Sequence, residues 1–347
     1  MKEAIVSKGP KVEIVDSPIP QPNDDQVLIQ VVVSGSNPKD WKIPVWVGGS
    51  ANQGDDIAGV VAKVGANVTE FKPGDRVAAF HEMRTPGGSY AEYAIAWQAT
   101  TFHIPPTTSF EEASTLPLAA LTAAVGLYVD LGLPAPWAAP PPPADQAPPS
   151  TPLIVYGASS AVGDFALQFA ALSNIHPIIA VAGQSSALVE SRIDRSKGDT
   201  VVDYRGGDEA AVAALKKAVG DLKVHHAYDA ISEHSSTYIA SQALQPNGKI
   251  TLVLPRKEDP RITTPLTETR TGVGRVHQDL KDFGFVFSRY MGRALQQGKL
   301  KGHPHEVVPG GLGGIETALT KLSEGKAHGL KYVFRVKETE GAGQDKL

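Results

Sequence analysis

Apolar residues in the first hundred positions come in short runs rich in valine and isoleucine, separated by Gly, Pro, Asn and Asp. Such runs are typical of β-strands joined by tight turns. They predict an antiparallel, barrel-like β domain with strands over residues 12–15, 26–33, 57–64, 75–80 and 90–96. Ser109 and Glu112 then have the spacing of a capping box, which predicts a helical segment continuing to about Leu131.

From Leu153 onward, short apolar strands alternate with stretches of helical spacing. Strands are expected at 153–156, 177–183, 201–204, 227–231 and 249–254, with helices over 161–172 and 208–219 and from about 186 and 235. Repeated βα units of this kind form a parallel, doubly wound sheet. A long helical stretch over 278–297 leads into short β segments at 306–308 and 331–336.

These patterns predict a first domain that is interrupted by an inserted α/β domain and completed by the C-terminal residues. The expected boundaries are 1–125 for the first part, 126–289 for the inserted domain, 290–340 for the return and 341–347 for a flexible tail. Residues 134–152 hold nine prolines and are expected to form a proline-rich surface loop or hinge.

Composition excludes several classes of function. Hydrophobic residues are 41% of the chain, and no apolar run is long enough for a membrane span. Lys and Arg number 33 against 37 Asp and Glu, so the net charge of −4 provides no field for a nucleic acid partner. The absence of cysteine excludes disulfides and thiolate–zinc sites. The amino terminus has no secretory pattern, so a cytoplasmic location is expected.

The strongest local signal is the turn Gly157-Ala-Ser159-Ser160-Ala161-Val162-Gly163, which follows an apolar strand and opens a helix. Glycines in this context let the backbone approach a pyrophosphate, whose charge is met by free amides and by the positive end of the helix. We expect these residues to bind a dinucleotide, with hydroxyl donors from the two serines. The alternative is an ordinary tight turn between strand and helix.

Cofactor choice is read at the end of the second strand of such a domain, where an acid binds the ribose hydroxyls of NAD. Here the strand ends in Gly183-Gln184-Ser185-Ser186, without an acid. Small hydroxylic residues leave room for a 2′-phosphate, so NADPH is preferred over NADH. Arg192, Lys197 and Arg205 are candidate sources of positive charge, with solvated surface cations as the alternative.

Several motifs together resemble the medium-chain dehydrogenase/reductase superfamily. They are Gly35-Ser-Asn37-Pro38-Lys-Asp40-Trp-Lys42, Gly54-Asp55-Asp56-Ile-Ala-Gly59, Phe71-Lys-Pro-Gly-Asp-Arg-Val77, Gly88-Ser-Tyr-Ala-Glu-Tyr93, Leu116-Pro-Leu-Ala-Ala-Leu-Thr122 and Gly329-Leu-Lys-Tyr-Val333. The resemblance implies an α/β fold with a GroES-like β-barrel catalytic domain and a Rossmann domain that has a doubly wound parallel sheet.

Zinc alcohol dehydrogenases of that superfamily place a cysteine at the position of Asn37 and a Gly-His-Glu at 54–56. Both metal ligands are missing here. The only histidine pairs, His303 with His305 and His225 with His226, have no apparent third ligand, so no metal site is expected. The chain is therefore most similar to the zinc-independent branch, which includes quinone oxidoreductases and trans-acting enoyl reductases of fungal polyketide pathways.

The resemblance to enoyl reductases implies roles for particular residues. Tyr204 is expected near the adenosine phosphate and ribose, Thr122 near the nicotinamide, and Leu254 among the cofactor-binding residues. Lys42, Thr122 and Asn37 are the catalytic candidates, as donors to the oxygen that gains charge when hydride adds to a conjugated C=C bond. The structural alternatives are that Lys42 is a surface lysine, that the Thr122 hydroxyl bonds to its own helix backbone, and that Asn37 is a turn residue.

The sequence thus predicts a zinc-independent, NADPH-dependent reductase of an activated C=C bond. Its substrate is a small molecule, namely an enone, an enoyl thioester or a quinone, and a polyketide synthase is a candidate partner. A quinone reductase of the same fold and a non-catalytic NADPH-binding structural or sensing protein remain alternatives. Monomer and homodimer are both open. His81, Trp41, Trp46, Phe283, Phe285 and Tyr290 are further candidates for the cleft, with core packing as the alternative.

Overall fold

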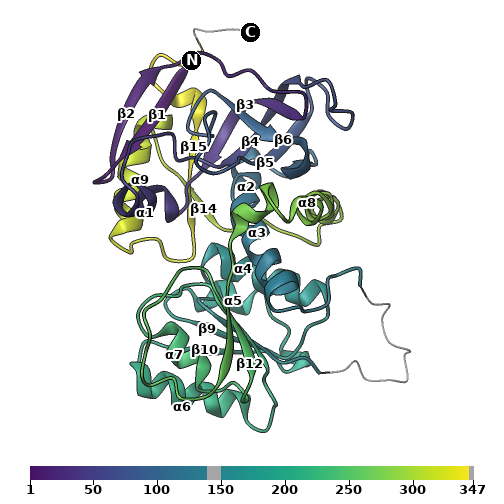
Figure 1. Cartoon of the computed structure of the whole chain (residues 1–347), viewed down its shortest axis with the longest axis vertical. Helices are drawn as coiled ribbons and strands as arrows, with labels where there is room; N and C mark the ends of the chain where they lie inside the picture. The colour runs from purple at the N-terminus through teal and green to yellow at the C-terminus, as the bar shows by residue number, and fades with distance from the viewer. Residues whose placement is uncertain (139–149, 344–347) are drawn as a thin grey trace. The chain divides into compact units, whose positions relative to one another are not determined.

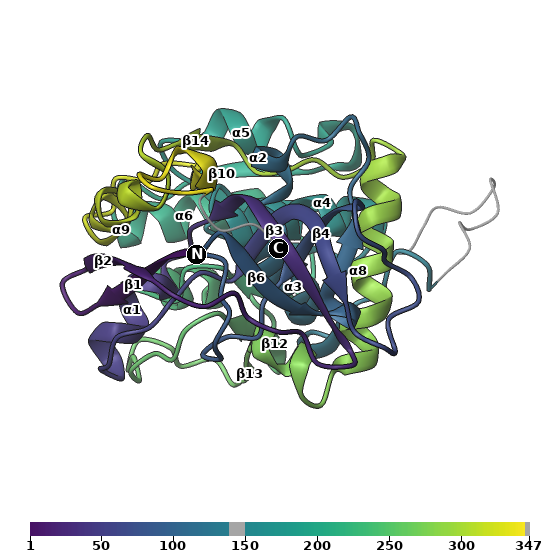
Figure 2. The same cartoon turned by 90° about the horizontal axis from the view of Figure 1, so that it is seen from above.

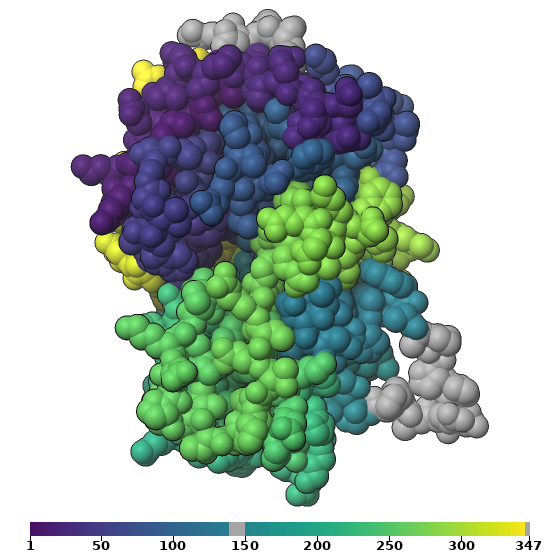
Figure 3. Space-filling view, viewed as in Figure 1, coloured from purple at the N-terminus to yellow at the C-terminus, as the bar shows by residue number. Residues whose placement is uncertain are grey.

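The computed structural model describes residues 1–138 and 150–343. Most of the predicted proline-rich loop and the last four residues of the predicted tail lie outside the described residues. The chain divides into two compact units: unit 1 contains Met1–Leu121 with Gly274–Leu347, and unit 2 contains Thr122–Val273. The α/β unit is inserted into a unit that both ends of the chain complete. In Figure 3, purple N-terminal and yellow C-terminal residues both contribute to the visible surface of unit 1.

Unit 1 is built around an extended, mainly antiparallel sheet (Figure 1). Its strands are β1 (Lys2–Ser7), β2 (Lys11–Asp16), β3 (Gln26–Gly35), β4 (Asp56–Val64), β5 (Arg76–Phe80), β6 (Tyr93–Trp97), β7 (Thr101–His103), β14 (His305–Val307) and β15 (Lys331–Arg335). Within the described ranges the order of the larger sheet is β14-β15-β3-β4-β5-β7, with β6 also paired to β3, while β1 and β2 form a separate hairpin. Val333 pairs with Gly35, so β15 joins the end of the chain to β3.

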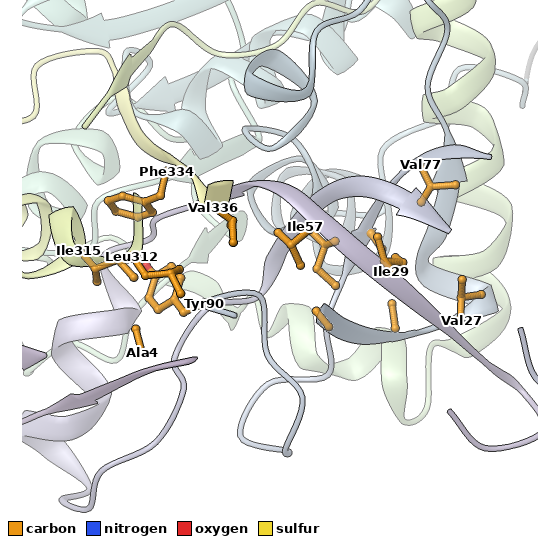
Figure 4. Packing of buried hydrophobic residues seen from close by; sticks show 14 of the residues in the cluster. Ala4, Val27, Ile29, Ile57, Val77, Tyr90, Leu312, Ile315, Phe334 and Val336 are labelled. Atoms are coloured by element: carbon orange, nitrogen blue, oxygen red, sulfur yellow. The ribbon is translucent and has the colours of Figure 1, made fainter. Parts of the chain in front are cut away.

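The core of unit 1 combines residues from the beginning, the middle and the end of the chain. Figure 4 shows Tyr90 beside Leu312, Ile315 and Phe334, each of which is fully buried. The rings of Tyr90 and Phe334 meet edge to face with centroids 5.7 Å apart. Because this core needs side chains from both chain segments, unit 1 can form only when both are present.

The helices of unit 1 differ in how well the sequence predicts them. They are α1 (Lys39–Trp46), α2 (Phe110–Ala113), the start of α3 (Pro117–Ala124), α8 (Lys281–Gln296) and α9 (Ile315–Ser323). Ser109 caps α2 by accepting the Glu112 amide, as predicted. The carboxylate of Glu112 instead accepts the amide of Gly302 at 2.9 Å, so the reciprocal half of the expected capping box is absent. The predicted helix to Leu131 is divided into α2, α3 and a π-helical segment over Val125–Asp130.

Helix α8 explains why the second domain boundary differs from the expected residue 290. Its buried face includes Phe287, Met291 and Leu295, and Gly292 lets it approach the backbone of His103 in β7. Figure 2 shows α8 running along one side of unit 1. The whole helix therefore packs with unit 1, and the chain leaves unit 2 at Val273.

Unit 2 is a parallel sheet with helices packed against it. Its elements are β8 (Leu153–Tyr156), α4 (Ala161–Leu172), β9 (Ile178–Ala182), α5 (Ser186–Glu190), β10 (Thr200–Asp203), α6 (Asp208–Val219), β11 (His226–Asp229), α7 (Ser236–Ser241), β12 (Gly248–Leu252) and β13 (Leu266–Arg270). The described strands lie in the order β10-β9-β8-β11-β12-β13. All neighbouring pairs are parallel.

This strand order reverses direction at β8, since β9 and β10 lie on one side and β11 to β13 on the other. Ligands of such sheets bind beyond the carboxyl ends of the strands at the point of reversal. Alternate residues Ile154 and Tyr156 pack with Leu215 of α6 and Ile239 of α7 in one buried cluster. The sequence predicted the doubly wound sheet correctly but contained no recognised signal for its edge strand β13.

Candidate functional site

The turn between β8 and α4 is shaped as the sequence predicts for a dinucleotide cradle. Gly157 has φ of 73°, a left-handed conformation that favours glycine. The amides of Gly157 and Ala158 both donate to Val181 O at 3.0 Å, which holds the turn against β9. A Cβ on Gly163 would overlap the carbonyl oxygen of Gly157, so the helix begins in direct contact with the turn. The glycines at 157 and 163 are therefore required by the backbone itself.

Ser160 serves chiefly as the N-cap of α4, since its Oγ accepts the Gly163 amide at 3.0 Å. Ser159, Ser160, Ala161 and Val162 are half-buried and remain reachable from solvent. Helix α4 presents its positive end at this point. The Ser160 N–H already donates to Gly157 O at 2.8 Å, so the local geometry fits a pyrophosphate beside the amides of Ser159, Ala161 and Val162.

Tyr204 lies at the corner where β9 ends. A Cβ added to Gly183 would meet the Tyr204 ring at 2.9 Å, and the ring centroids of Tyr204 and Tyr156 are 5.8 Å apart. Tyr204 is 41% exposed, so part of this residue remains open to solvent. Ser185 and Ser186 are half-buried in the adjacent turn. Leu254 is also half-buried, beyond the end of β12 at the same edge of the sheet.

The three candidate cations of unit 2 have different environments. Arg192 is committed to the fully buried Asp164 of α4, with a distance of 2.7 Å between Nε and Oδ1. Lys197 donates to Asn174 Oδ1 at 2.9 Å. Arg205 pairs with Asp203 at 2.6 Å, and the two side chains are 57% and 51% exposed. Arg205, next to Tyr204, is therefore the cation best placed to exchange its partner for a phosphate.

Lys42 is not an ordinary surface lysine. It lies in α1 and is 6% exposed. Its ammonium is 5.6 Å from the ring centroid of Trp41 and 5.7 Å from that of Trp46. Aromatic faces attract a cation through the electrostatics of the ring. The indole of Trp46, by contrast, is 57% exposed.

Thr122 is buried in α3, one residue beyond the boundary between the units. Its carbonyl oxygen accepts the hydroxyl of Tyr228 from β11 at 2.9 Å. A Cβ on Gly126 would overlap the Tyr228 ring, so glycine at 126 makes this bond sterically possible. The π-helical turn begins at Val125, and π-turns often occur at functional sites. The backbone at Thr122 is therefore held from two directions.

Asn37 is part of a buried polar cluster. Its Nδ2 donates to Asp56 Oδ2 at 2.7 Å, and its Oδ1 accepts the Lys331 ammonium at 3.1 Å. Lys331 also forms a short ion pair with Asp56. Both polar atoms of the Asn37 side chain are thus engaged within unit 1, which favours a structural role for this residue.

A second charged cluster adjoins the first. The ammonium of Lys39 contacts Asp40 Oδ1 at 2.9 Å and forms a short ion pair with Asp55. Asp40 Oδ2 accepts hydrogen bonds from the Tyr90 hydroxyl at 2.6 Å and from the backbone N–H of Asn37 at 2.7 Å. Burial raises the pKa of Asp40 to about 6, although Lys39 opposes this shift, and burial also raises the pKa of Asp55. Lys39, Asp40 and Asp55 belong to the motifs described above, but the sequence pattern did not predict that they form an ion-pair cluster.

His81 has a structural environment. Its Nδ1 lies 2.7 Å from Ile95 O and its Nε2 lies 3.1 Å from Thr85 O. Phe283 and Tyr290 have rings in contact with Phe287 on α8, whereas Phe285 is 40% exposed.

No group of three His, Asp or Glu side chains among the described residues is arranged to hold a metal ion. No helix in the described part of the chain has the length and apolarity to cross a membrane.

A groove of about 340 Å³ lies elsewhere in unit 1, between β7 and α8. Its lining includes Phe71, His103 and Arg289. Arg289 already binds Glu70 and three backbone carbonyl oxygens, those of Gln98, Ala99 and Thr101. Its charge is therefore used in holding α8, and the groove contains none of the predicted site residues.

Comparison with known proteins agrees with this architecture. Residues 23–106 match the alcohol dehydrogenase GroES-like domain family. The chain is 50% identical to the trans-enoyl reductase fsr4 of Gibberella fujikuroi, over 89% of this chain and 91% of that protein. It is 30% identical to the chloroplastic quinone-oxidoreductase QR1 of Triphysaria versicolor, with 83% of each chain covered. A solved structure of a putative zinc-dependent alcohol dehydrogenase from Rhizobium etli has a TM-score of 0.80 at 22% identity, covering 96% of this chain and 98% of the other.

The fold and these matches define an oxidoreductase with a GroES-like domain and a doubly wound domain. The chain belongs to the medium-chain dehydrogenase/reductase superfamily, in its zinc-independent branch. Its activity is of the enoyl reductase type, with quinone reduction as the alternative.

Proposed function

We propose that this chain uses NADPH to reduce a C=C bond conjugated to a carbonyl group. The observation that supports this most strongly is the turn at Gly157–Gly163, which places the half-buried start of α4 at the reversal point of the parallel sheet. The 50% identical relative is named a trans-enoyl reductase. The turn supports a dinucleotide as hydride donor, and the relative supports an activated alkene as the acceptor.

The residues of unit 2 fit a dinucleotide. The pyrophosphate would lie beside residues 159–162, where the positive end of α4 favours negative charge. Tyr204, Ser185 and Ser186 would surround the adenosine ribose and its 2′-phosphate, and Leu254 would lie farther along the same sheet edge. Bound NADPH supplies the hydride that adds to the β carbon of the substrate.

Lys42 and Thr122 would act on the substrate carbonyl. Addition of hydride at the β carbon moves charge onto the carbonyl oxygen, giving an enolate, and a proton then adds at the α carbon. The Lys42 ammonium, which lies near two indole rings, and the Thr122 hydroxyl are the donors that stabilise this charge. Water serves as the final proton source.

The test is turnover by the purified chain. Oxidation of NADPH at 340 nm is followed with an α,β-unsaturated thioester, a simple enone and a quinone, and product is identified by mass spectrometry. We expect the thioester or enone to have the highest kcat/KM, with one deuterium from 4-deuterated NADPH at the β carbon. Turnover of the quinone alone would favour the alternative supported by the 30% identical quinone oxidoreductase. A thioester preference would also support a polyketide synthase as partner.

The preference for NADPH rests on Arg205 and on the absence of an acid at residues 183–186. The exposed ion pair between Arg205 and Asp203 is weak enough to open, which frees the guanidinium for a 2′-phosphate. We expect calorimetry to give a Kd for NADPH at least about tenfold below that for NADH. Arg205→Ala should reduce this ratio, whereas Lys197→Ala should leave it unchanged. Equal affinities in the unmodified chain would contradict the preference. A cytoplasmic location stays a prediction, with monomer and homodimer as the two alternatives for the oligomeric state.

A further inference from the structure

The carboxylate of Asp56 joins three segments of unit 1 that are far apart in the sequence. Its Oδ1 accepts the backbone N–H of Leu118 at 2.7 Å. Its Oδ2 accepts Asn37 Nδ2–H at 2.7 Å and the ammonium of Lys331. The side chains of Asp56 and Lys331 are 0% and 3% exposed, so these bonds are made away from water.

Two of the three segments carry the proposed donors. Leu118 is in the first turn of α3, and Thr122 lies four residues farther along the same helix. Asn37 stands just before α1, the helix that contains Lys42. Asp56 therefore bonds to the first turn of α3 and to the residue that precedes the N-cap of α1, and its negative charge is favourable at the amino end of α3.

Packing around the cluster leaves little freedom for it to rearrange. A Cβ on Gly35 would meet Lys331 Cε at 3.1 Å and Asp56 Cβ at 3.2 Å. The β15–β3 pairing fixes the strand that carries Lys331. A buried ion pair often adds little net stability compared with apolar packing. Its directional bonds, however, determine where the connected segments lie.

Building on the proposed function, we propose that Asp56 and Lys331 are positioning residues for hydride transfer. Their buried ion pair, completed by the Asn37 amide, sets the first turns of α1 and α3 and thereby the places of Lys42 and Thr122. Asn37 belongs to this cluster and acts through it.

The test compares Asp56→Asn, Lys331→Met and the double variant with the unmodified chain. Asn keeps the shape and an acceptor for Leu118 but removes the charge that binds Lys331. Glu306→Gln is the control, since it removes an acid from an exposed pair with Lys321. For each protein we measure kcat and KM with the best enone or thioester, the Kd for NADPH, and the primary isotope effect with 4-deuterated NADPH.

Each single variant is expected to lower kcat about 10–100-fold, because a donor displaced by about 1 Å loses much of its effect. The Kd for NADPH should change less than about twofold, since the cofactor turn belongs to unit 2. The isotope effect should rise as hydride transfer becomes rate-limiting. A merely structural role would reduce the number of NADPH-binding sites without changing kcat per site or the isotope effect.

Unchanged kcat per binding site and an unchanged isotope effect in both single variants would overturn the positioning role. If a single variant does not fold, the double variant decides, because it carries no unpaired buried charge: lowered kcat with normal NADPH binding supports the role, and normal kcat overturns it. Absence of enone and thioester turnover in the unmodified chain contradicts the proposed function instead. The same variants are then compared with the quinone as substrate.

Discussion

Lys42 and Thr122 are the residues at which the proposed chemistry can be tested most directly. Thr122→Val keeps the side-chain shape while removing its hydroxyl, and Lys42→Met removes the ammonium while keeping a long side chain near the indoles. Each should lower kcat by about 10–10³-fold with little change in NADPH affinity, as expected for a donor used mainly in the transition state. Steady-state kinetics and cofactor titration check this.

The matched control for the threonine is Thr107→Val, which alters an exposed residue. It should leave kcat unchanged. Full kcat in both Thr122→Val and Lys42→Met would contradict these roles and would mean that water or the cofactor ribose stabilises the enolate.

Gly157 allows a sharper test of the cofactor site than its place in a motif would. A Cβ there would overlap Ile231 Cγ1, in addition to the strain of the left-handed φ of 73°. Gly157→Ala should therefore abolish measurable NADPH binding and lower the Tm. Gly207→Ala is the control, since Gly207 has φ of 93° but no atom within 4 Å of a new Cβ. It should lower stability by about 1–2 kcal/mol while binding NADPH normally.

Asp40 should give unit 1 a distinct pH dependence. Burial raises its pKa from 3.8 to about 6, so the folded state holds a proton that the unfolded state releases. The resulting stability is present below about pH 4 and is lost as pH rises through about 6, by up to about 3 kcal/mol. Urea unfolding of the unmodified chain and of Asp40→Asn between pH 4 and 7.5 tests this.

The expected result is a difference in unfolding free energy, unmodified chain minus Asp40→Asn, that decreases with rising pH. Lys39, Asp55 and Tyr90 face Asp40 in both proteins, so titrations that they share largely cancel in this comparison. A difference that is constant across the range would mean that Asp40 remains ionised throughout.

At the scale of elements, Arg192 connects the helices at the cofactor end of unit 2. It lies beyond α5 and binds Asp164 in the first turn of α4, where the carboxylate is fully buried. Arg192→Met leaves this charge without its cation, which destabilises a protein by about 3–5 kcal/mol. We expect a lower unfolding free energy of this size in urea but an unchanged ratio of NADPH to NADH affinity. A changed ratio would instead make Arg192 a phosphate ligand.

The same elements show what sequence patterns can predict. Helices α4 and α6 occupy the residues expected for them. Each follows a strand; α6 has a clear apolar face, whereas α4 is buried along most of its length. Strand β13 was not predicted, since its sequence Leu266–Arg270 is mostly polar and it forms an exposed sheet edge. Helix α1 contains Pro44 and has only eight residues, which weakens its periodic signal.

Site residues were predictable where they depend on local backbone geometry and not where they depend on distant partners. The glycine turn was predictable because its backbone requirements are local. The partner of Asp56 was not, because Lys331 is 275 residues away in the sequence and the pairing depends on β15 joining β3. Arg192 was considered for phosphate binding because its pairing with Asp164 could not be predicted either: Asp164 lies 28 residues earlier, on α4.

At the scale of the whole molecule, the two units differ in how they depend on the chain ends. Unit 2 is one continuous segment with its own buried cluster around Ile154, Leu215 and Ile250. Unit 1 needs β15, which supplies Phe334 to its core and Lys331 to the Asp56 cluster. Loss of the C-terminal strand should therefore affect the units unequally.

A chain that ends at Leu330 tests this difference. It lacks β15, and we expect unit 1 to lose its cooperative unfolding transition. Residues 33–35 of β3 are left without a strand partner, and Asp56 is left with an unneutralised buried charge. Unit 2 should retain a transition that NADPH shifts to higher temperature. Calorimetry with and without NADPH, and with a full-length control, checks both outcomes. Loss of every transition together with the cofactor response would show that unit 2 cannot fold without an intact unit 1.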